Sequence, residues 1–145
     1  MLEVMVDKFI FRVEEDRFYS HDGVWVALEG ARARVGLTDF SQQLNGDLAF
    51  ARVKPAGTEI KASEAFADIE TVKAILELSS PVTGRILEVN AELEASPELI
   101  NEDPYGKGWL AVLELNSWEE EKGNLLNAPR YLSLVKEQAE AEMKK

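Results

Sequence analysis

Short apolar runs, each followed by a glycine or a polar turn, succeed one another along most of the chain, from Phe9 to Leu115. The runs are rich in Val, Ile, Leu and aromatic residues. This rhythm is typical of an all-β sandwich or barrel. A tight reversal is expected at Glu29-Gly30. The predicted strands cover residues 9–13, 24–28, 33–37, 48–53, 65–69, 74–78, 84–89 and 109–115.

Short helices are expected between and after the strands, because each has its own start signal. Thr38 can cap the first helix, and Gly46 can close it by taking a left-handed conformation. Ser96 can cap the second, with Pro97 at the first helical position, where its missing N–H costs nothing. A capping-box pattern that begins at Ser117 predicts a third.

A longer helix is predicted over residues 128–143, with Asn127 as its cap. Its apolar stripe ends early, so residues 138–145 are expected to be solvated and frayed. No internal repeat or linker divides the chain, and a single domain is predicted. Residues 1–17 would be an N-terminal extension, 18–115 the β core and 117–145 the C-terminal helices. The predicted fold class is mainly β with a C-terminal helical cap.

Charge and composition narrow the classes of partner and chemistry. Sixteen basic against 27 acidic residues give a net charge of −11, which disfavours nucleic acid as a partner. The chain has no cysteine, so redox chemistry would need an attached cofactor. No apolar run approaches the roughly 20 residues that span a bilayer, and the N-terminus lacks a signal-peptide pattern. We therefore expect a soluble, cytoplasmic protein with no membrane partner.

Candidate catalytic groups are few. His21 is the sole histidine, and a Ser–His–acid hydrolase would need it beside an activated serine, yet no Gly-x-Ser-x-Gly motif is present. The polar stretch around His21 indicates a turn. The three glutamates at 119–121 fit the N-terminus of a helix, where negative charge is favourable, better than a metal site. No catalytic or metal centre is predicted.

Lys73 lies between two predicted strands, 65–69 and 74–78, which would pair as a hairpin with this lysine at its tip. Taken alone, such a lysine is ordinarily a solvated residue. Its surroundings are acidic, however, and an acidic collar around one lysine could be recognised by a modifying enzyme. Acylation would remove the charge of the amine and make the side chain a long tether. The acids are Glu64, Asp68, Glu70 and Glu77.

Several separated motifs, in the right order, resemble the H-protein family of the glycine cleavage system. The resemblance runs from about Phe18 to Leu134 and is strongest between Asn90 and Leu110. It implies a lipoyl carrier with the sandwiched β-barrel fold of lipoyl and biotinyl domains. The motifs are VGLTDF at 35–40, GD at 46–47, ETVKA at 70–74, SPVTG at 80–84, NAEL at 90–93 and PELINEDPYGKGWL at 97–110.

The resemblance implies that lipoate is amide-linked to Lys73, because the family's lipoyl-bearing lysine maps onto this position. Glu70 precedes it by three residues and Pro81 follows it by eight, as in the family. A biotin carrier would be expected to have methionines on both sides of its lysine, where this chain has Val72 and Ala74. Such a protein performs no catalysis of its own but carries an intermediate between enzymes.

The chain also departs from the family pattern. Residues 21–25 read His-Asp-Gly-Val-Trp where the family has an uninterrupted His-Glu-Trp. Leu76 and Glu77 replace a small polar residue and an aspartate, which makes the expected resting surface of the arm more apolar. Residues with an expected role in recognition or in docking of the arm are Glu70, Asp68, Glu77, Leu76 and His21.

These departures resemble a related branch, the lipoate-binding proteins of a heterodisulfide-reductase-like sulfur-oxidising system. We place this pathway slightly ahead of glycine cleavage, in which the arm would carry the aminomethyl group. Expected partners are a lipoate-protein ligase or lipoyltransferase, dihydrolipoyl dehydrogenase, and either the heterodisulfide-reductase-like complex or glycine decarboxylase with aminomethyltransferase. A third possibility is a scaffold protein that carries no lipoate.

Overall fold

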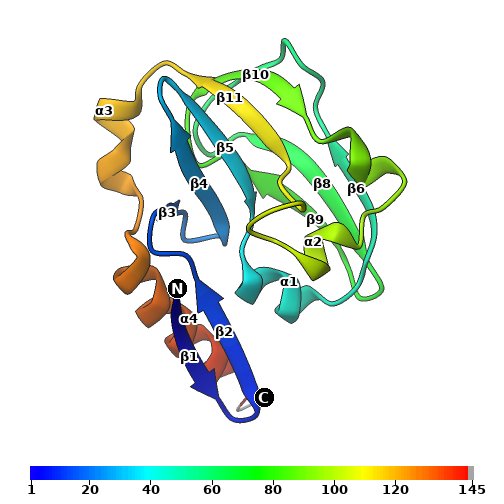
Figure 1. The fold of residues 1–145 in the computed structure, drawn as a ribbon, viewed down its shortest axis with the longest axis vertical. Coiled ribbons are helices and arrows are strands. Elements are labelled where there is room, and N and C mark those ends of the chain that lie inside the picture. The colour runs from blue at the N-terminus through cyan, green and yellow to red at the C-terminus, as the bar shows by residue number, and fades with distance from the viewer. Residues whose placement is uncertain (144–145) are drawn as a thin grey trace.

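The strands form three antiparallel sheets in the computed structural model, which describes residues 1–143 (Figure 1). The last two residues of the predicted C-terminal segment, Lys144 and Lys145, lie outside the described residues. The strands are β1 (Leu2–Val6), β2 (Phe9–Val13), β3 (Phe18–Tyr19), β4 (Val24–Glu29), β5 (Arg32–Leu37), β6 (Leu48–Val53), β7 (Glu59–Ile60), β8 (Ala65–Thr71), β9 (Ile75–Ser79), β10 (Gly84–Val89) and β11 (Ala111–Leu115).

The helices are short except for the last one, and none within residues 1–143 has the length and apolar composition that crossing a membrane requires. They are α1 (Asp39–Asn45), the 3-10 helix η1 (Ala91–Glu94), α2 (Leu99–Glu102), α3 (Trp118–Glu121), the 3-10 helix η2 (Lys122–Asn124) and α4 (Ala128–Met143).

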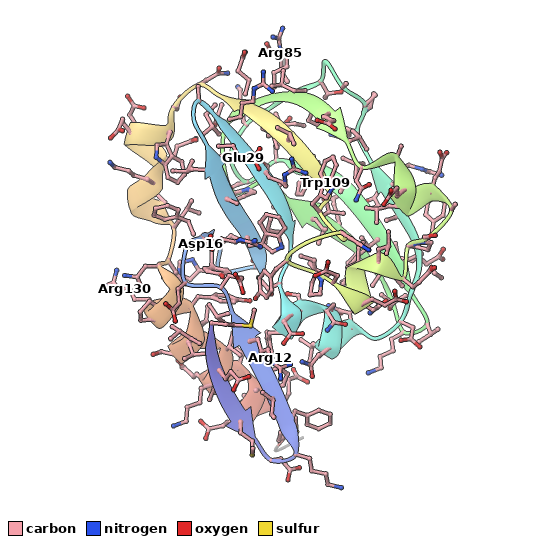
Figure 2. The ribbon with its side chains drawn as sticks, in the orientation of Figure 1. Arg12, Asp16, Glu29, Arg85, Trp109 and Arg130 are labelled. Carbon is pink, nitrogen blue, oxygen red and sulfur yellow. The ribbon has the colours of Figure 1, made fainter. Side chains whose placement is uncertain are left out.

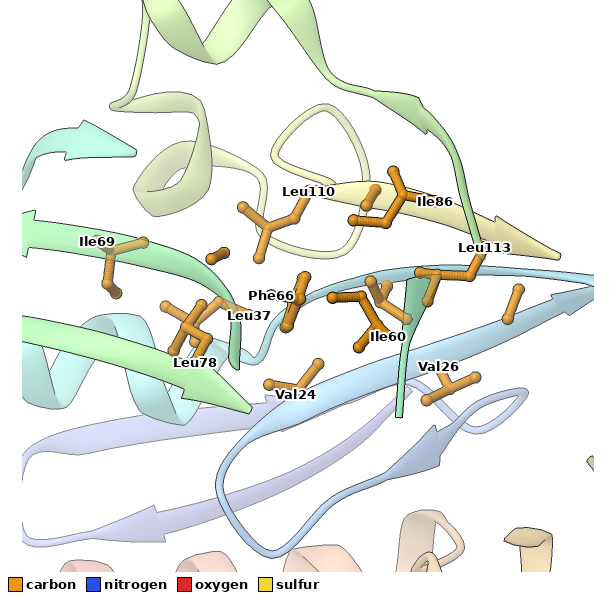
Figure 3. Close-up of a cluster of buried hydrophobic side chains, with 14 of the residues drawn as sticks. Val24, Val26, Leu37, Ile60, Phe66, Ile69, Leu78, Ile86, Leu110 and Leu113 are labelled. Atoms are coloured by element: carbon orange, nitrogen blue, oxygen red, sulfur yellow. The ribbon is translucent and has the colours of Figure 1, made fainter. Parts of the chain in front are cut away.

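The two larger sheets share one hydrophobic core (Figure 3). The six-stranded sheet has the order β3-β4-β5-β11-β10-β7, and the three-stranded sheet has the order β6-β8-β9. Val24 and Leu113 of the first sheet belong to the same buried cluster as Phe66 and Ile69 of the second. The predicted mainly β sandwich is therefore confirmed. Within residues 1–143 the sheets remain separate and do not close into one barrel.

A second core covers the other face of the six-stranded sheet, beneath α4 and the β1–β2 hairpin (Figure 1). Trp25 points into this core from β4, whereas its neighbours Val24 and Val26 belong to the first. Consecutive residues of a strand face opposite sides, so β4 is buried on both. The sequence prediction contained neither β1 nor this second layer.

The C-terminal helix continues to Met143, so the predicted fraying from residue 138 is wrong as far as that residue, whereas the predicted exposure holds for residue 138 and for residues 140–143. Ala139 is 1% exposed and lies in the second core with Val135 of the same helix and Val6 of β1. The local sequence did not reveal the burial of Ala139, because its packing partner comes from the other end of the chain. The predicted cap is confirmed, since Asn127 Oδ1 accepts a hydrogen bond from Arg130 N at 3.0 Å.

The predicted caps of the short helices have mixed outcomes. Thr38 caps α1 by accepting a hydrogen bond from Ser41 N, and Gly46 ends it with φ of 85°, as expected. The prediction for Ser96 is wrong, because Asn90 caps an earlier turn, η1, and α2 begins only after Glu98. The third helix does begin after Ser117, but within residues 1–143 this serine makes no side-chain capping bond.

Candidate functional site

Lys73 is exposed at the middle of the three-residue loop, residues 72–74, that joins β8 to β9. The hairpin is closed by a backbone hydrogen bond in which Thr71 N donates to Ala74 O at 2.8 Å. Val72, the loop residue before it, is 77% exposed. The hairpin reversal predicted at this lysine is therefore present, and the amine lies at the tip of the hairpin.

A buried hydroxyl holds this loop. Thr71 is 6% exposed, and its Oγ1 accepts hydrogen bonds from Lys73 N and from Ala74 N, each at 3.1 Å. A Ser or Thr side chain that binds the amides two and three residues ahead is a recognised turn motif. One side chain therefore fixes the backbone on both sides of the lysine Cα. Sequence reasoning missed this role, although the residue type and spacing could have indicated it.

A Thr71→Val variant is expected to loosen the loop, because valine keeps the shape of the side chain but cannot accept the two hydrogen bonds. The free energy of unfolding should fall by about 1 kcal/mol. The amides of Lys73 and Ala74 should exchange with solvent faster, as measured by NMR. Thr71→Ser keeps the hydroxyl and is the matched control. Unchanged exchange in the valine variant would mean that the hydroxyl does not hold the loop.

The segment after α1 contacts the tip of the β8–β9 hairpin. Asp47 O accepts a hydrogen bond from Val72 N at 3.3 Å. A Cβ placed on Gly46 would lie 3.8 Å from Lys73 Cε, so the stem of the lysine passes over this glycine. Asn101 of α2 fixes the same segment, because its Nδ2 donates to Gly46 O and its Oδ1 accepts from Leu48 N. Sequence reasoning did not find Asn101, whose partners are far away in the chain.

A cavity of about 450 Å³ lies beside this hairpin, between β9, α1 and α4. It brings together three of the residues predicted for arm docking, namely His21, Leu76 and Glu77. Leu44 of α1 and Tyr131 of α4 also line it. Its lining combines apolar residues with polar ones, among them His21.

Tyr131 gives this cavity a rigid, uncharged wall. It is 1% exposed, and its hydroxyl lies 2.7 Å from Thr38 Oγ1. Burial raises the pKa of Tyr131 to about 12, so the phenol is neutral at physiological pH. Among the described residues no group of three or more His, Cys, Asp and Glu side chains is placed to hold a metal ion.

The other two predicted residues, Asp68 and Glu70, do not line the cavity. They lie on the exposed face of the three-stranded sheet, where Asp68 pairs across strands with Glu77 and Glu70 pairs with Ile75. The predicted site residues are therefore divided between a cavity on one side of β9 and a sheet surface on the other. Basic side chains such as Arg85 and Arg130 point into solvent elsewhere on the molecule (Figure 2).

Comparison with known proteins gives one consistent family. The family model described as "Glycine cleavage H-protein" matches residues 17–138. The glycine cleavage system H protein of Bacillus licheniformis is 44% identical over 119 residues, which cover 82% of this chain and 93% of the relative. A protein of Pyrococcus abyssi named probable glycine cleavage system H protein is 39% identical over 133 residues, 91% of this chain and 98% of the relative.

A solved structure agrees with these relatives. The crystal structure of a glycine cleavage system H protein from Mycobacterium marinum matches with a TM-score of 0.75 and 32% sequence identity, and the match covers 83% of this chain and 97% of that one. Nothing in these comparisons supports the preference for a sulfur-oxidising pathway that was drawn from Leu76, Glu77 and residues 21–25. The names of the relatives favour the glycine cleavage alternative.

Proposed function

The chain belongs to the glycine cleavage H-protein family, and from this premise we propose that it is the lipoylated carrier of a glycine cleavage system, with lipoate amide-linked to Lys73. Proteins of this family are carriers rather than catalysts, and they hold lipoate covalently on a lysine. The observation that carries the proposal is Lys73 itself, exposed on the β8–β9 loop within the sequence ETVKA.

The residues around Lys73 fit a lipoyl group. An exposed amine on a fixed loop is accessible for acylation, and the neighbouring cavity has room and apolar walls for a flexible chain. When bound, lipoate supplies a strained disulfide at the end of a long tether, which can accept a carbon unit and be reduced to two thiols. The protein's part is to hold the tether and to offer it a resting place.

We assign that resting place to the cavity between β9, α1 and α4. Leu44 and Leu76 offer apolar contact to the alkyl part of the arm. His21 lies at the same cavity and can donate or accept a hydrogen bond. None of these residues needs to do chemistry for the carrier to function.

The proposed partners follow from this function. A lipoate-protein ligase or lipoyltransferase would acylate Lys73. Glycine decarboxylase would load the arm, aminomethyltransferase would unload it, and dihydrolipoyl dehydrogenase would restore the disulfide.

Two measurements test the proposal in sequence. After incubation with lipoate-protein ligase, lipoate and ATP, intact-mass spectrometry should show one lipoyl group, and peptide mapping should locate it at Lys73. The lipoylated protein should then support exchange of labelled bicarbonate into the carboxyl group of glycine by glycine decarboxylase. Protein without lipoate is the control. An unmodified lysine would contradict the carrier function, and a lipoylated protein inert with the decarboxylase would contradict the pathway.

A further inference from the structure

The three-stranded sheet carries an unusual exposed surface beside Lys73, which we call the outer sheet face. Its side chains form two rows across the strands, and the register of the sheet places the members of each row directly opposite one another. All six side chains are exposed. The first row is Phe50, Glu70 and Ile75, and the second is Arg52, Asp68 and Glu77.

The backbone geometry of the strands turns the two apolar members of this face, Phe50 and Ile75, toward solvent. Leu48 of β6 is buried, and strict alternation along the strand would turn Phe50 inwards as well. The register shifts between these two residues, because a bulge inserts one extra residue, and Phe50 emerges on the outside with 41% of its surface exposed. Ile75 is 73% exposed on β9, the edge strand on the other side of β8. Near the proposed modification site, these two exposed side chains offer apolar contact to a protein that approaches Lys73.

The charged members leave this face acidic. Asp68 and Glu77 are directly opposite each other, an arrangement of like charges that destabilises a sheet. Arg52 is opposite Asp68 on the other side, but within residues 1–143 no salt bridge joins them. The guanidinium of Arg52 lies instead over the Phe50 ring, 5.0 Å from its centroid. The two carboxylates are therefore available to a basic partner.

Resting on the function proposed above, we propose that the outer sheet face is the docking surface for the enzyme that attaches lipoate to Lys73. That enzyme must act before any arm exists, so it has to bring its active site to the loop itself. The enzymes that load and unload the carrier meet the far end of the arm and can stand farther from the loop. The complementary surface would carry an apolar pocket for Phe50 and Ile75 and basic residues opposite Asp68 and Glu77.

The chemistry of lipoyl attachment requires the enzyme to hold the Lys73 loop in a defined position. The step forms an amide bond between Lys73 Nζ and the lipoyl carbonyl carbon, and breaks the bond between that carbon and the phosphate of a lipoyl adenylate. Two protons leave the ammonium group, and the nucleotide is the leaving group. The attacking nitrogen has to be held close to the carbonyl carbon, which requires docking to fix the loop in place.

The test is the kinetics of lipoylation with purified lipoate-protein ligase, lipoate and ATP, followed by intact-mass spectrometry. A Phe50→Ser, Ile75→Ser double variant is expected to lower kcat/KM about tenfold, mainly through KM. The matched control is Met5→Ser, Ile10→Ser, which removes an exposed cross-strand apolar pair from the β1–β2 hairpin and should leave kcat/KM unchanged. Ile75→Thr, which keeps the β-branched shape that strands favour, should by itself lower kcat/KM measurably.

Charge is tested separately. Asp68→Asn, Glu77→Gln should lower kcat/KM and weaken its dependence on salt. Glu137→Gln, Glu140→Gln removes the same charge from the exposed side of α4 and should do neither. If wild-type protein is lipoylated but the outer-face variants behave like their controls, the docking surface is wrong and the carrier function stands. If the wild-type protein takes no lipoate, the carrier function itself fails.

Discussion

A Lys73→Arg variant is expected to gain no lipoyl mass and to support no turnover of a reconstituted glycine cleavage reaction, followed as NADH formation by dihydrolipoyl dehydrogenase. Arginine keeps the positive charge and nearly the length of the side chain, so the β8–β9 loop should be unchanged. The guanidinium, however, stays protonated at any accessible pH and cannot act as an acyl acceptor. The loss should therefore be complete, down to the rate without carrier.

The control for this variant is Lys61→Arg, an exposed lysine of the segment before β8. It should be lipoylated and active like the wild type. Circular dichroism should give the same spectrum and the same melting temperature for both variants, because neither side chain is buried. A lipoyl group found on the Lys73→Arg variant would place the attachment site at another lysine and would contradict the assignment to Lys73.

The strands with clear apolar runs were predictable because the apolar pattern of a strand and the turn residues that bound it are local in the sequence. The bounds of β2, β6 and β10 agree with the prediction. The two-residue strands β3 and β7 could not be predicted, since alternation has no meaning over two residues. Strand β1 does alternate, but its inner residues contact α4 at the opposite end of the chain. Sequence pattern alone does not reveal such a partner.

The candidate site also contains residues that the sequence predicts and residues that it does not. Lys73 was predictable because the hairpin that presents it is local and its motif is characteristic. The cavity was only partly predictable, because Leu76 and Glu77 come from β9, His21 from the loop before β4 and Tyr131 from α4. Departures in sequence pointed to three of these residues. They gave no reason to include Tyr131, which reaches the cavity only because the second core holds α4 in place.

Tyr131→Ala is expected to lower the free energy of unfolding by about 4 kcal/mol, as measured by urea denaturation. The ring is buried and stacks on Tyr19 with centroids 4.5 Å apart, and its hydroxyl bonds Thr38, the cap of α1. One side chain therefore joins α4, β3 and α1. A loss of this size is a large fraction of the 5–15 kcal/mol that stabilises a typical domain.

Two controls separate the contributions of the Tyr131 ring and hydroxyl. Tyr131→Phe keeps the ring and removes the hydroxyl, so it should cost only about 1 kcal/mol. Leu132→Ala truncates the next residue of the helix, which is only partly buried, and should cost clearly less than Tyr131→Ala. If the two alanine variants were equally stable, the Tyr131 ring would not be the main contact of α4 with the rest of the fold.

The pH dependence of the free energy of unfolding is an independent test of the burial of Tyr131. Burial raises the pKa of Tyr131 to about 12 in the folded protein, whereas a tyrosine in the unfolded chain titrates near about 10. The stabilisation is therefore fully present below pH ~10 and is lost as pH rises through the folded pKa, by about 3 kcal/mol in total. Burial also raises the pKa values of Tyr19 and Tyr105, which add to the same alkaline loss. In Tyr131→Phe the fall in stability between pH ~10 and ~12 should be shallower than in the wild type, and an unchanged slope would show that Tyr131 is not buried as described.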